Sequence, residues 1–218
     1  MRIGVLSDTH TAEGLDAFGP EPAAFFSSVD LILHTGDIIA PAVLDWLEQF
    51  APLLAVRGNH DVIDDPRMQD LIRFEREGWW IGAVHIADDI RAHPERVERM
   101  KGLSFGGPGL DILIAGDSHY ERMEYHDRTL LLNSGSALLP HQTNMRLGSV
   151  ALLELSPERV RAELLHLGES EGLRNPAHTG HIEFDRNGPI SASHNGAPIA
   201  IEDGRVRWPG IHGPDDQL

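Results

Sequence analysis

The sequence predicts an α/β fold with four layers, α/β/β/α, followed by an extension that is either β-rich or disordered. Short apolar segments alternate with helical segments in the first part of the chain, and two alternating apolar and polar segments follow from residue 149. After His166, glycine and proline become frequent and long apolar runs end. We therefore expect one domain over residues 1–166 and a Gly/Pro-rich extension over residues 167–218.

Six short apolar segments are expected to be strands of an at least partly parallel sheet, because helical segments separate most of them. These strands are Arg2–Ser7, Leu31–His34, Leu53–Val56, Trp79–His85, Asp111–Ala115 and Thr129–Leu132. The expected helices are Pro20–Ser28, Pro41–Phe50, Pro66–Glu77 and Pro94–Lys101. Proline is well tolerated in the first turn of a helix, and it lies at the start of all four. In the third helix, Leu71, Ile72 and Phe74 are expected to face the core.

The region after residue 148 is expected to form a second sheet. Ser149–Leu155 and Arg159–Leu165 alternate like antiparallel strands around a turn at Ser156-Pro157. In the extension, Asn-Gly or Asp-Gly turn signals recur every eight residues, which is typical of a small meander. Its four expected strands are Ile182–Phe184, Ile190–Ser193, Ile199–Ile201 and Arg205–Trp208. A mobile tail is the alternative, and the histidines there (His178, His181, His194, His212) are interpreted as polar tail residues rather than metal ligands.

Composition excludes several classes of function. The 218 residues contain no cysteine, so disulfides, a cysteine nucleophile and thiolate zinc sites are excluded. The formal net charge is -16 and no cluster of lysine and arginine is present, which argues against duplex nucleic acid as a partner. No apolar run approaches the roughly 20 residues that a membrane span needs. We expect a cytoplasmic protein that acts on a small substrate without binding a membrane, and a homo-oligomer is possible.

Metal-ligand residues follow directly after most of the expected strands. The segments are Asp8-Thr9-His10, Gly36-Asp37, Gly58-Asn59-His60-Asp61, His85 and Gly116-Asp117-Ser118-His119, with a weaker one at Asn133-Ser134-Gly135-Ser136. In an open α/β sheet, ligands bind beyond the carboxyl ends of the strands, so we expect these residues to meet at one rim. A mixture of aspartate, histidine and asparagine suits two adjacent divalent cations. A metal-dependent hydrolase is therefore the leading interpretation.

This series of motifs resembles the calcineurin-like metallophosphoesterases, and in particular the small bacterial and archaeal phosphodiesterases, over about residues 1–165. The order Asp-x-His, Gly-Asp, Gly-Asn-His-Asp and Gly-x-x-His is specific, although each motif alone is weak. The resemblance implies a metallophosphoesterase sandwich for residues 1–166. It also implies a first cation held by Asp8, His10, Asp37 and His119, and a second held by Asn59, His85 and a bridging Asp37.

The resemblance assigns His60 to the reaction itself. In the family this histidine lies beside the phosphate, stabilises developing charge and is able to protonate the leaving oxygen. Its imidazole suits that role, because histidine titrates near neutral pH. Asp61 is expected to orient His60 or its loop. Arg57 precedes Gly58 and would either contact a substrate phosphate or pair with a carboxylate.

Three departures from the family pattern affect the expected site. Asp117 stands where the family has a histidine ligand of the second cation, and we expect it to act as a ligand. Ile86 replaces a glycine after His85. The family's Asn-Pro-Gly-Ser stretch here has serine in place of proline, and His141 replaces a nearby basic residue. Because a carboxylate is a hard ligand, Asp117 favours Mn²⁺, with iron, zinc, nickel and magnesium as alternatives.

The expected activity is phosphodiester hydrolysis, in which a hydroxide activated by two cations attacks phosphorus. The alternatives are a phosphomonoesterase or nucleotide phosphatase, and a non-catalytic scaffold like the retromer subunit of this fold. A non-catalytic scaffold would not need His60 together with nearly all the metal ligands. A third hypothesis is that residues 167–218 recruit a partner or cap the site while the core remains catalytic.

Overall fold

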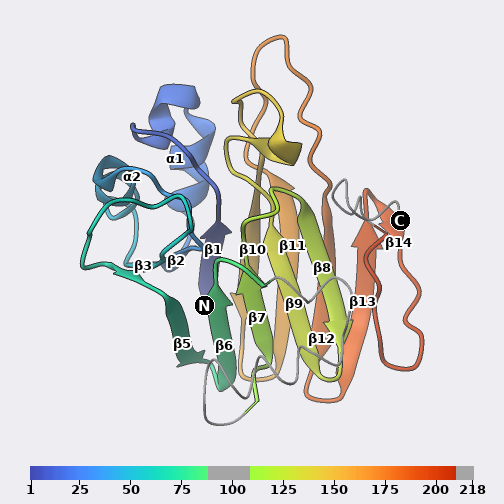
Figure 1. The fold of residues 1–218 in the computed structure, drawn as a ribbon. Helices are drawn as coiled ribbons and strands as arrows, with labels where there is room; N and C mark the ends of the chain where they lie inside the picture. Colours follow the sequence, from blue (N-terminus) through green and yellow to red (C-terminus); the bar gives the residue numbers. More distant parts are fainter. Residues whose placement is uncertain (88–108, 210–218) are drawn as a thin grey trace.

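The fold is a sandwich of two twisted β-sheets, seen in a computed structural model that describes residues 1–87 and 109–209 (Figure 1). The two α-helices of the described residues, α1 (Glu21–Phe26) and α2 (Pro41–Leu47), lie near the start of the chain and cover the outer face of the first sheet. Short 3-10 helices span Leu15–Phe18 (η1) and Pro140–Gln142 (η2). The α/β sandwich class predicted from the sequence is confirmed.

The first sheet has nine strands in the order β14-β13-β12-β11-β10-β1-β2-β3-β4. Its parallel half contains β1 (Arg2–Leu6), β2 (Leu31–His34), β3 (Leu53–Val56) and β4 (Met68–Gln69). Its antiparallel half contains β10 (Ser149–Leu155), β11 (Arg159–His166), β12 (Gly180–Asp185), β13 (Gly188–His194) and β14 (Ala197–Pro198). The two halves join where β1 pairs with β10. The prediction that the strands after residue 148 form a second sheet is therefore wrong, because backbone pairing with β1 places β10 and β11 in the first sheet.

The second sheet has five strands in the order β5-β6-β7-β9-β8. Its strands are β5 (Leu71–Arg76), β6 (Trp79–Val84), β7 (Ile112–Ala115), β8 (Glu121–His126) and β9 (Thr129–Ser134). The central strands β6, β7 and β9 are parallel, and antiparallel strands flank them. Their carboxyl ends therefore lie at one edge of the sheet.

Of three apolar clusters among the described residues, the two larger ones hold the layers together. The larger core lies between the sheets, where Ile3 and Val5 of β1 pack in one cluster with Ile81 of β6 and Ile114 of β7. The second core lies between the first sheet and its helices, and it includes Leu44 of α2. Since alternate residues of a strand face opposite sides of a sheet, the strands of the first sheet serve both cores.

Several predicted elements differ from the structure. The strands expected over Ile199–Ile201 and Arg205–Trp208 are not formed: the short β14 precedes the first, and the second makes only isolated bridges at Arg205 and Val206. The helix expected over Pro66–Glu77 is instead β4 and β5, because Ile72 and Phe74 alternate with polar residues at the period of a strand. Strand β8 was not predicted, since the buried Glu121 hides its alternation. The helix expected over Pro94–Lys101 falls within residues 88–108, which the structure does not describe.

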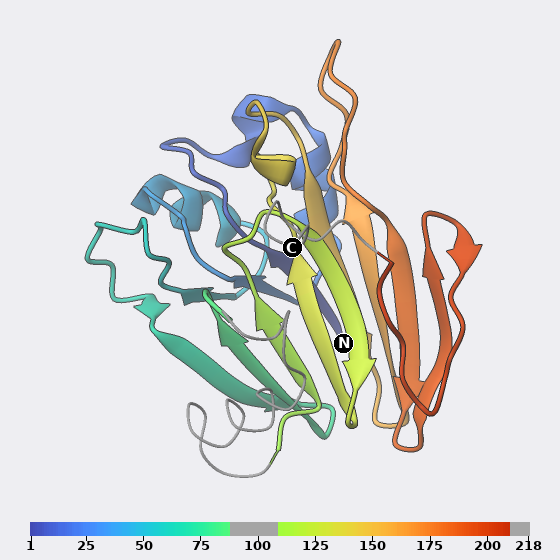
Figure 2. The same cartoon turned by 45° about the vertical axis from the view of Figure 1, so that its right-hand side comes forward.

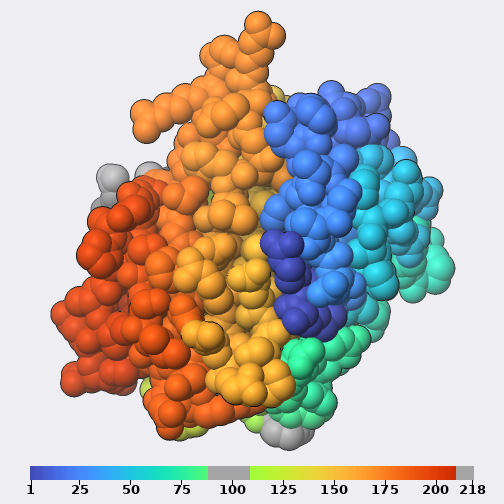
Figure 3. Space-filling model, turned by 180° about the vertical axis from the view of Figure 1, so that it is seen from behind, coloured from blue at the N-terminus to red at the C-terminus, as the bar shows by residue number. Residues whose placement is uncertain are grey.

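The extension continues the first sheet, as the β-rich alternative predicts. Strands β12 and β13 form a hairpin around Asn187, and Val206 then forms a bridge with Tyr125 of β8, so the extension contacts both sheets (Figure 2). Seen from behind, the red and orange extension lies beside β10 and β11, and an orange segment stands out above them (Figure 3). The division at residue 166 stays a prediction. In the described ranges, no helix has the length and hydropathy needed to span a bilayer.

Candidate metal centre

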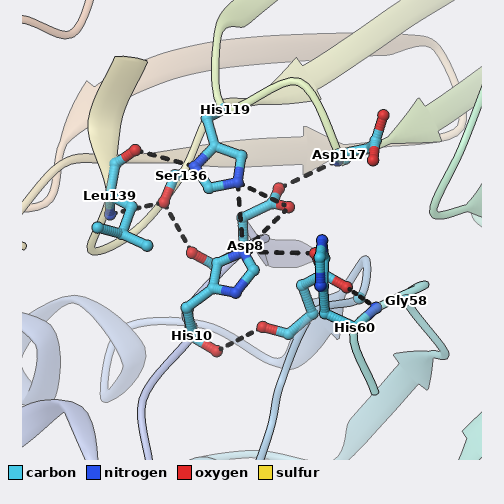
Figure 4. A network of polar contacts seen from close by, with 12 residues as sticks. Asp8, His10, Gly58, His60, Asp117, His119, Ser136 and Leu139 are labelled. Atoms are coloured by element: carbon cyan, nitrogen blue, oxygen red, sulfur yellow. Dashed lines mark hydrogen bonds and ion pairs between the residues drawn. The ribbon is translucent and has the colours of Figure 1, made fainter. Parts of the chain in front are cut away.

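The segments that follow β1, β2, β3, β6 and β7 meet at one edge of the sandwich, as the sequence predicts. Figure 4 shows Asp8 at the centre of this meeting point, with His10 and His119 on one side and Asp117 on the other. Parallel strands bring these segments together because their carboxyl ends share one side of a sheet. The two sheets contribute different residues, so the site depends on how the sheets pack.

Asp8, His10 and His119 form the first group of donor atoms. The Nε2 atoms of His10 and His119 are 3.2 Å apart. Asp8 Oδ1 lies 3.6 Å from Nε2 of His119 and 4.0 Å from Nε2 of His10. Asp37 Oδ2 is also 3.3 Å from His10 Nε2. A carboxylate and two imidazoles at these separations suit one transition-metal ion.

Asp8, Asp37 and His85 form the second group. Nε2 of His85 lies 3.3 Å from Asp37 Oδ1, 2.9 Å from Asn59 Oδ1 and 3.8 Å from Asp117 Oδ1. The two oxygens of Asp37 thus approach different histidines, one in each group. This placement is what a bridging carboxylate requires, and it brings Asn59 and Asp117 within reach of the second group.

Two carbonyl oxygens fix how the histidines present their nitrogens. Nδ1 of His85 donates to the carbonyl of Thr35 at 2.7 Å, and Nδ1 of His119 donates to the carbonyl of Leu139 at 3.0 Å. With the proton on Nδ1, the neutral ring keeps an electron pair on Nε2. Partners of this kind commonly orient metal-binding histidines. Each Nε2 atom can therefore face a cation, whose binding would displace any proton held there.

The backbone at the site is strained. Five of the seven predicted ligands have positive φ: Asp8 (53°), His10 (46°), Asp37 (58°), Asp117 (69°) and His119 (62°). Residues with a side chain rarely adopt this left-handed conformation, and such strain concentrates at functional sites. Gly36 has φ 107°, and an added Cβ would lie 3.0 Å from the Cα atom of Gly58. Glycine at position 36 thus allows the two loops to pack closely.

The charges of the site influence one another strongly. Burial raises the pKa of Asp8 to about 6, although His119 and His85 act against this shift. Burial also disfavours the charged form of His85, yet its hydrogen bond to Asp37 and the nearby carboxylates raise its pKa to about 9. Against its burial, hydrogen bonds from His85 and the amide of His60 lower the pKa of Asp37 to about 2. Burial lowers the pKa of His10.

The donor set fits divalent cations. Asp8 is fully buried, and its Oδ1 atom has no hydrogen-bond donor among the described residues. Burying a carboxylate oxygen without a donor is costly, so buried charges are normally paired or bound to metal. A cation beside Oδ1 would offset that cost. Oxygen and nitrogen donors without sulfur suit manganese, iron, zinc or nickel.

His60 and Asp61 lie on the loop after β3. The backbone N–H of His60 donates to Asp37 Oδ1 at 3.0 Å, and its exposed ring lies edge-on to His10 with the ring centres 5.6 Å apart. Asp61 accepts hydrogen bonds from backbone amides at 2.7–3.1 Å, and its donors are Asp37, Ile38, Ile39 and Gly58. Asp61 therefore orders the two loops and accepts no hydrogen bond from the ring of His60.

Arg57 contacts the loop after β3 and the residue between β4 and β5. Its guanidinium donates to the carbonyl of Ile63 at 2.6 Å and lies 4.0 Å from Asp64 and 3.9 Å from Asp70. This arrangement favours pairing with carboxylates, and the predicted phosphate contact stays a prediction.

Sequence reasoning missed Glu121, a buried carboxylate two residues after His119. A charged residue at an inward-facing strand position is its only signal in the sequence.

Comparisons with known proteins also indicate a metallophosphoesterase. A family model for the calcineurin-like phosphoesterase superfamily domain matches residues 1–158. A probable metallophosphoesterase from Methanothermobacter thermautotrophicus is 34% identical over 77% of this chain and 94% of its own length. Another from Methanocaldococcus jannaschii is 35% identical over 78% of this chain and 83% of its own.

Solved structures share the fold at lower identity. Vacuolar protein sorting 29 from Cryptosporidium parvum has a TM-score of 0.68 at 18% identity, covering 85% of this chain and 98% of its own. The Entamoeba histolytica protein of the same name, solved in complex with zinc, has a TM-score of 0.63 at 20% identity, covering 85% and 99%. An archaeal phosphodiesterase has a TM-score of 0.53 at 22% identity, covering 76% and 100%. At these identities the likeness shows the fold alone.

Proposed function

Since this chain belongs to the calcineurin-like phosphoesterase superfamily and is a metallophosphoesterase, we propose that it hydrolyses phosphodiesters with the aid of two divalent cations. The observation that carries the proposal is the pair of donor groups that share Asp8, with Asp37 between them. A pair of cations suits phosphoryl transfer, because it neutralises charge on both the attacking and the leaving oxygens.

The proposed ligands divide between two cations. The first would be held by Asp8, His10, Asp37 and His119, and the second by Asp37, Asn59, His85 and Asp117. When bound, the cations would stabilise charge on the phosphoryl oxygens and lower the pKa of a water molecule. We expect manganese to support the reaction best, because most of the second set are oxygen donors.

The chain's own groups would complete the chemistry. His60 is exposed beside the first donor group, where its imidazole would hydrogen-bond a phosphoryl oxygen and supply a proton to the leaving alcohol. Its amide bond to Asp37 ties the His60 loop to the proposed bridging carboxylate. Asp61 holds the same loop against the turn after β2. The loop would thus place His60 without relying on contacts to its ring.

Hydrolysis of bis-p-nitrophenyl phosphate tests the proposal. The full chain is stripped of metal, reloaded with manganese and compared with Asp37→Asn, and bound metal is counted by mass spectrometry. We expect manganese-dependent turnover, about two metals per chain, and loss of both turnover and the second metal in the variant. Hydrolysis of p-nitrophenyl phosphate alone would assign a monoesterase instead.

A second candidate is the non-catalytic protein-binding scaffold that the family resemblance also implies. The two candidates differ at His60, which a scaffold does not need. His60→Ala should lower turnover at least 100-fold while leaving the bound metal unchanged, since a general acid contributes about 10²–10⁴-fold. An active His60→Ala variant would contradict the role of this histidine, and a wild-type protein that hydrolyses neither ester would support the scaffold.

A further inference from the structure

A buried carboxylate gathers three segments beside His119. Glu121 begins β8, and its side chain is 1% exposed. Its Oε2 atom accepts hydrogen bonds from Nε2 of His141 at 2.8 Å and from the backbone N–H of His178 at 3.0 Å. Its Oε1 atom accepts the hydroxyl proton of Ser149 at 2.6 Å. Glu121 therefore connects η2, β10 and the extension next to the metal centre.

Three imidazoles form a continuous row from this point, which we call the histidine row: His141, His178 and His194. The rings of His141 and His178 have centres 5.7 Å apart, and Nδ1 of His178 lies 2.9 Å from Nε2 of His194. Tyr120 stacks on His141 at 4.6 Å, and Trp208 packs edge-on against His194 at 4.7 Å. The aromatic neighbours at both ends fix the orientation of the row.

The histidine row begins beside His119 of the metal centre. The backbone N–H of His141 donates to the carbonyl of His119 at 3.0 Å, and the imidazole of His119 donates to the carbonyl of Leu139. His141 adopts a left-handed backbone conformation (φ 54°, ψ 33°), which is uncommon for a residue with a side chain. With Nε2 bonded to Glu121, none of the hydrogen bonds found among the described residues uses its Nδ1 atom. A largely buried imidazole thus keeps one free polar atom beside the site.

His178 and His194 offer hydrogen bonds without a strong positive charge. His178 and His194 are half-buried, and burial lowers the pKa of each below that of free histidine. Glu121 places a negative charge at the start of the row, and the whole chain carries a formal charge of -16. A second anionic group would therefore be poorly held there. Neutral imidazoles both donate and accept hydrogen bonds, which is what a hydroxyl group needs.

We propose that the histidine row binds a hydroxyl-bearing substituent of the substrate, a polyol or a sugar, while the metal centre holds the phosphodiester group. This inference rests on the proposed function and names the substrate class of the same site. It also gives the extension a role, because His178 lies just before β12 and His194 is the last residue of β13. Residues of the extension, outside the metal-ligand motifs of residues 1–165, would then help to select the substrate.

Two esters with the same leaving group test the proposal: glyceryl p-nitrophenyl phosphate and methyl p-nitrophenyl phosphate, with the manganese-loaded full chain. We expect the wild type to prefer the glyceryl ester in kcat/KM. His178→Phe and His194→Phe keep a ring of similar size but lose its nitrogens. Each should lower kcat/KM about tenfold for the glyceryl ester and less than twofold for the methyl ester, as expected for one lost hydrogen bond.

The matched control is His126→Phe, at the other end of β8, which should leave both kcat/KM values unchanged. Product inhibition gives a second readout. Glycerol phosphate should inhibit the wild type more strongly than methyl phosphate does, whereas the two compounds should inhibit each variant equally. Equal loss for both esters, or a wild type without preference, would overturn the inference while leaving the proposed function intact. A wild type that hydrolyses neither ester would overturn the proposed function, and the subsite with it.

Discussion

A carboxylate at position 117 replaces the imidazole that the family resemblance implies. Asp117 Oδ1 lies 3.8 Å from Nε2 of His85, and its backbone N–H donates to Oδ2 of Asp8 at 3.2 Å. Its side chain is 34% exposed, whereas those of Asp8 and His85 are almost fully buried. Asp117 therefore lies at the open side of the second donor group, where its carboxylate would offer a cation a hard ligand.

Substitution of Asp117 should change the number and the identity of the bound metals. Asp117→Ala should lower the stoichiometry from about two metals to about one, because the second cation loses a ligand. Asp117→His should keep two metals but favour zinc over manganese, since imidazole is the softer ligand. Mass spectrometry of protein equilibrated with both metals measures each outcome. Two tightly bound metals in Asp117→Ala would show that Asp117 is not a ligand.

His34 should make stability depend on pH. It is fully buried, accepts the N–H of Gly36 at 3.2 Å, and burial, with the nearby His85, lowers its pKa to about 3. An unfolded histidine titrates near 6.5, so between pH 6.5 and 3 only the unfolded chain takes up this proton. This contribution is complete above pH 6.5 and is lost as the pH falls, by about 2 kcal/mol between pH 7 and 5.

Urea unfolding of the wild type and of His34→Asn, both in chelator, isolates this effect. The other titrating groups are common to both proteins, so the difference in their free energies of unfolding should shrink by about 2 kcal/mol from pH 7 to 5. Asparagine retains an acceptor for the amide of Gly36. A constant difference over this range would mean that His34 is protonated in the folded protein.

The sequence predicted site residues correctly where a metal-ligand side chain directly follows an apolar strand segment. Asp8, Asp37 and His119 follow apolar segments, so a topology that aligns the strands brings them together. Glu121 gave no such signal, because its position depends on partners from β10 and from the extension, far away in the sequence. Long-range hydrogen bonds of this kind leave no local pattern.

At the scale of elements, the strands with clear boundaries were predicted closely, and β2 and β3 match their expected bounds. The segment after residue 65 was misjudged because Leu71, Ile72 and Phe74 fit both periods. Pairing with β6 decides in favour of a strand, through backbone hydrogen bonds that the sequence does not reveal. The turn signals at Asn187-Gly188 and Asn195-Gly196 favoured the hairpins of the extension, which the structure contains.

Phe184 of β12 should contribute strongly to stability. Its side chain is 1% exposed and contacts Trp79 of β6 and Tyr125 of β8, with ring centres 5.4 and 5.0 Å away. Phe184→Ala should therefore lower the free energy of unfolding by about 3–5 kcal/mol, as measured by urea denaturation. Ile190→Ala, on the exposed part of β13, should change it by less than about 0.5 kcal/mol. If Phe184→Ala lowered the free energy of unfolding as little as Ile190→Ala does, the extension would not share the core.

At the scale of the whole molecule, the candidate site joins the two sheets. Asp8 and Asp37 follow strands of the first sheet, and His85 and His119 follow strands of the second. The packing of one sheet on the other thus sets the distances between donors. The sequence predicted two sheets and one rim, but it divided the strands wrongly between the sheets. The pairing of β1 with β10, which joins segments about 150 residues apart, places β10 and β11 in the first sheet and leaves no local pattern.

Metal binding should therefore stabilise the entire fold. The unfolded chain separates the ligands, so the cations bind chiefly to the folded state and stabilise it by about 2.7 kcal/mol at a concentration of 100 Kd. Urea denaturation in manganese and in chelator measures the difference. Asp37→Asn should show a smaller gain, because Asp37 lies between the two donor groups. His126→Ala, remote from the site, should gain as much as the wild type, and equal denaturation midpoints of the wild type in manganese and chelator would contradict a cation held between the sheets.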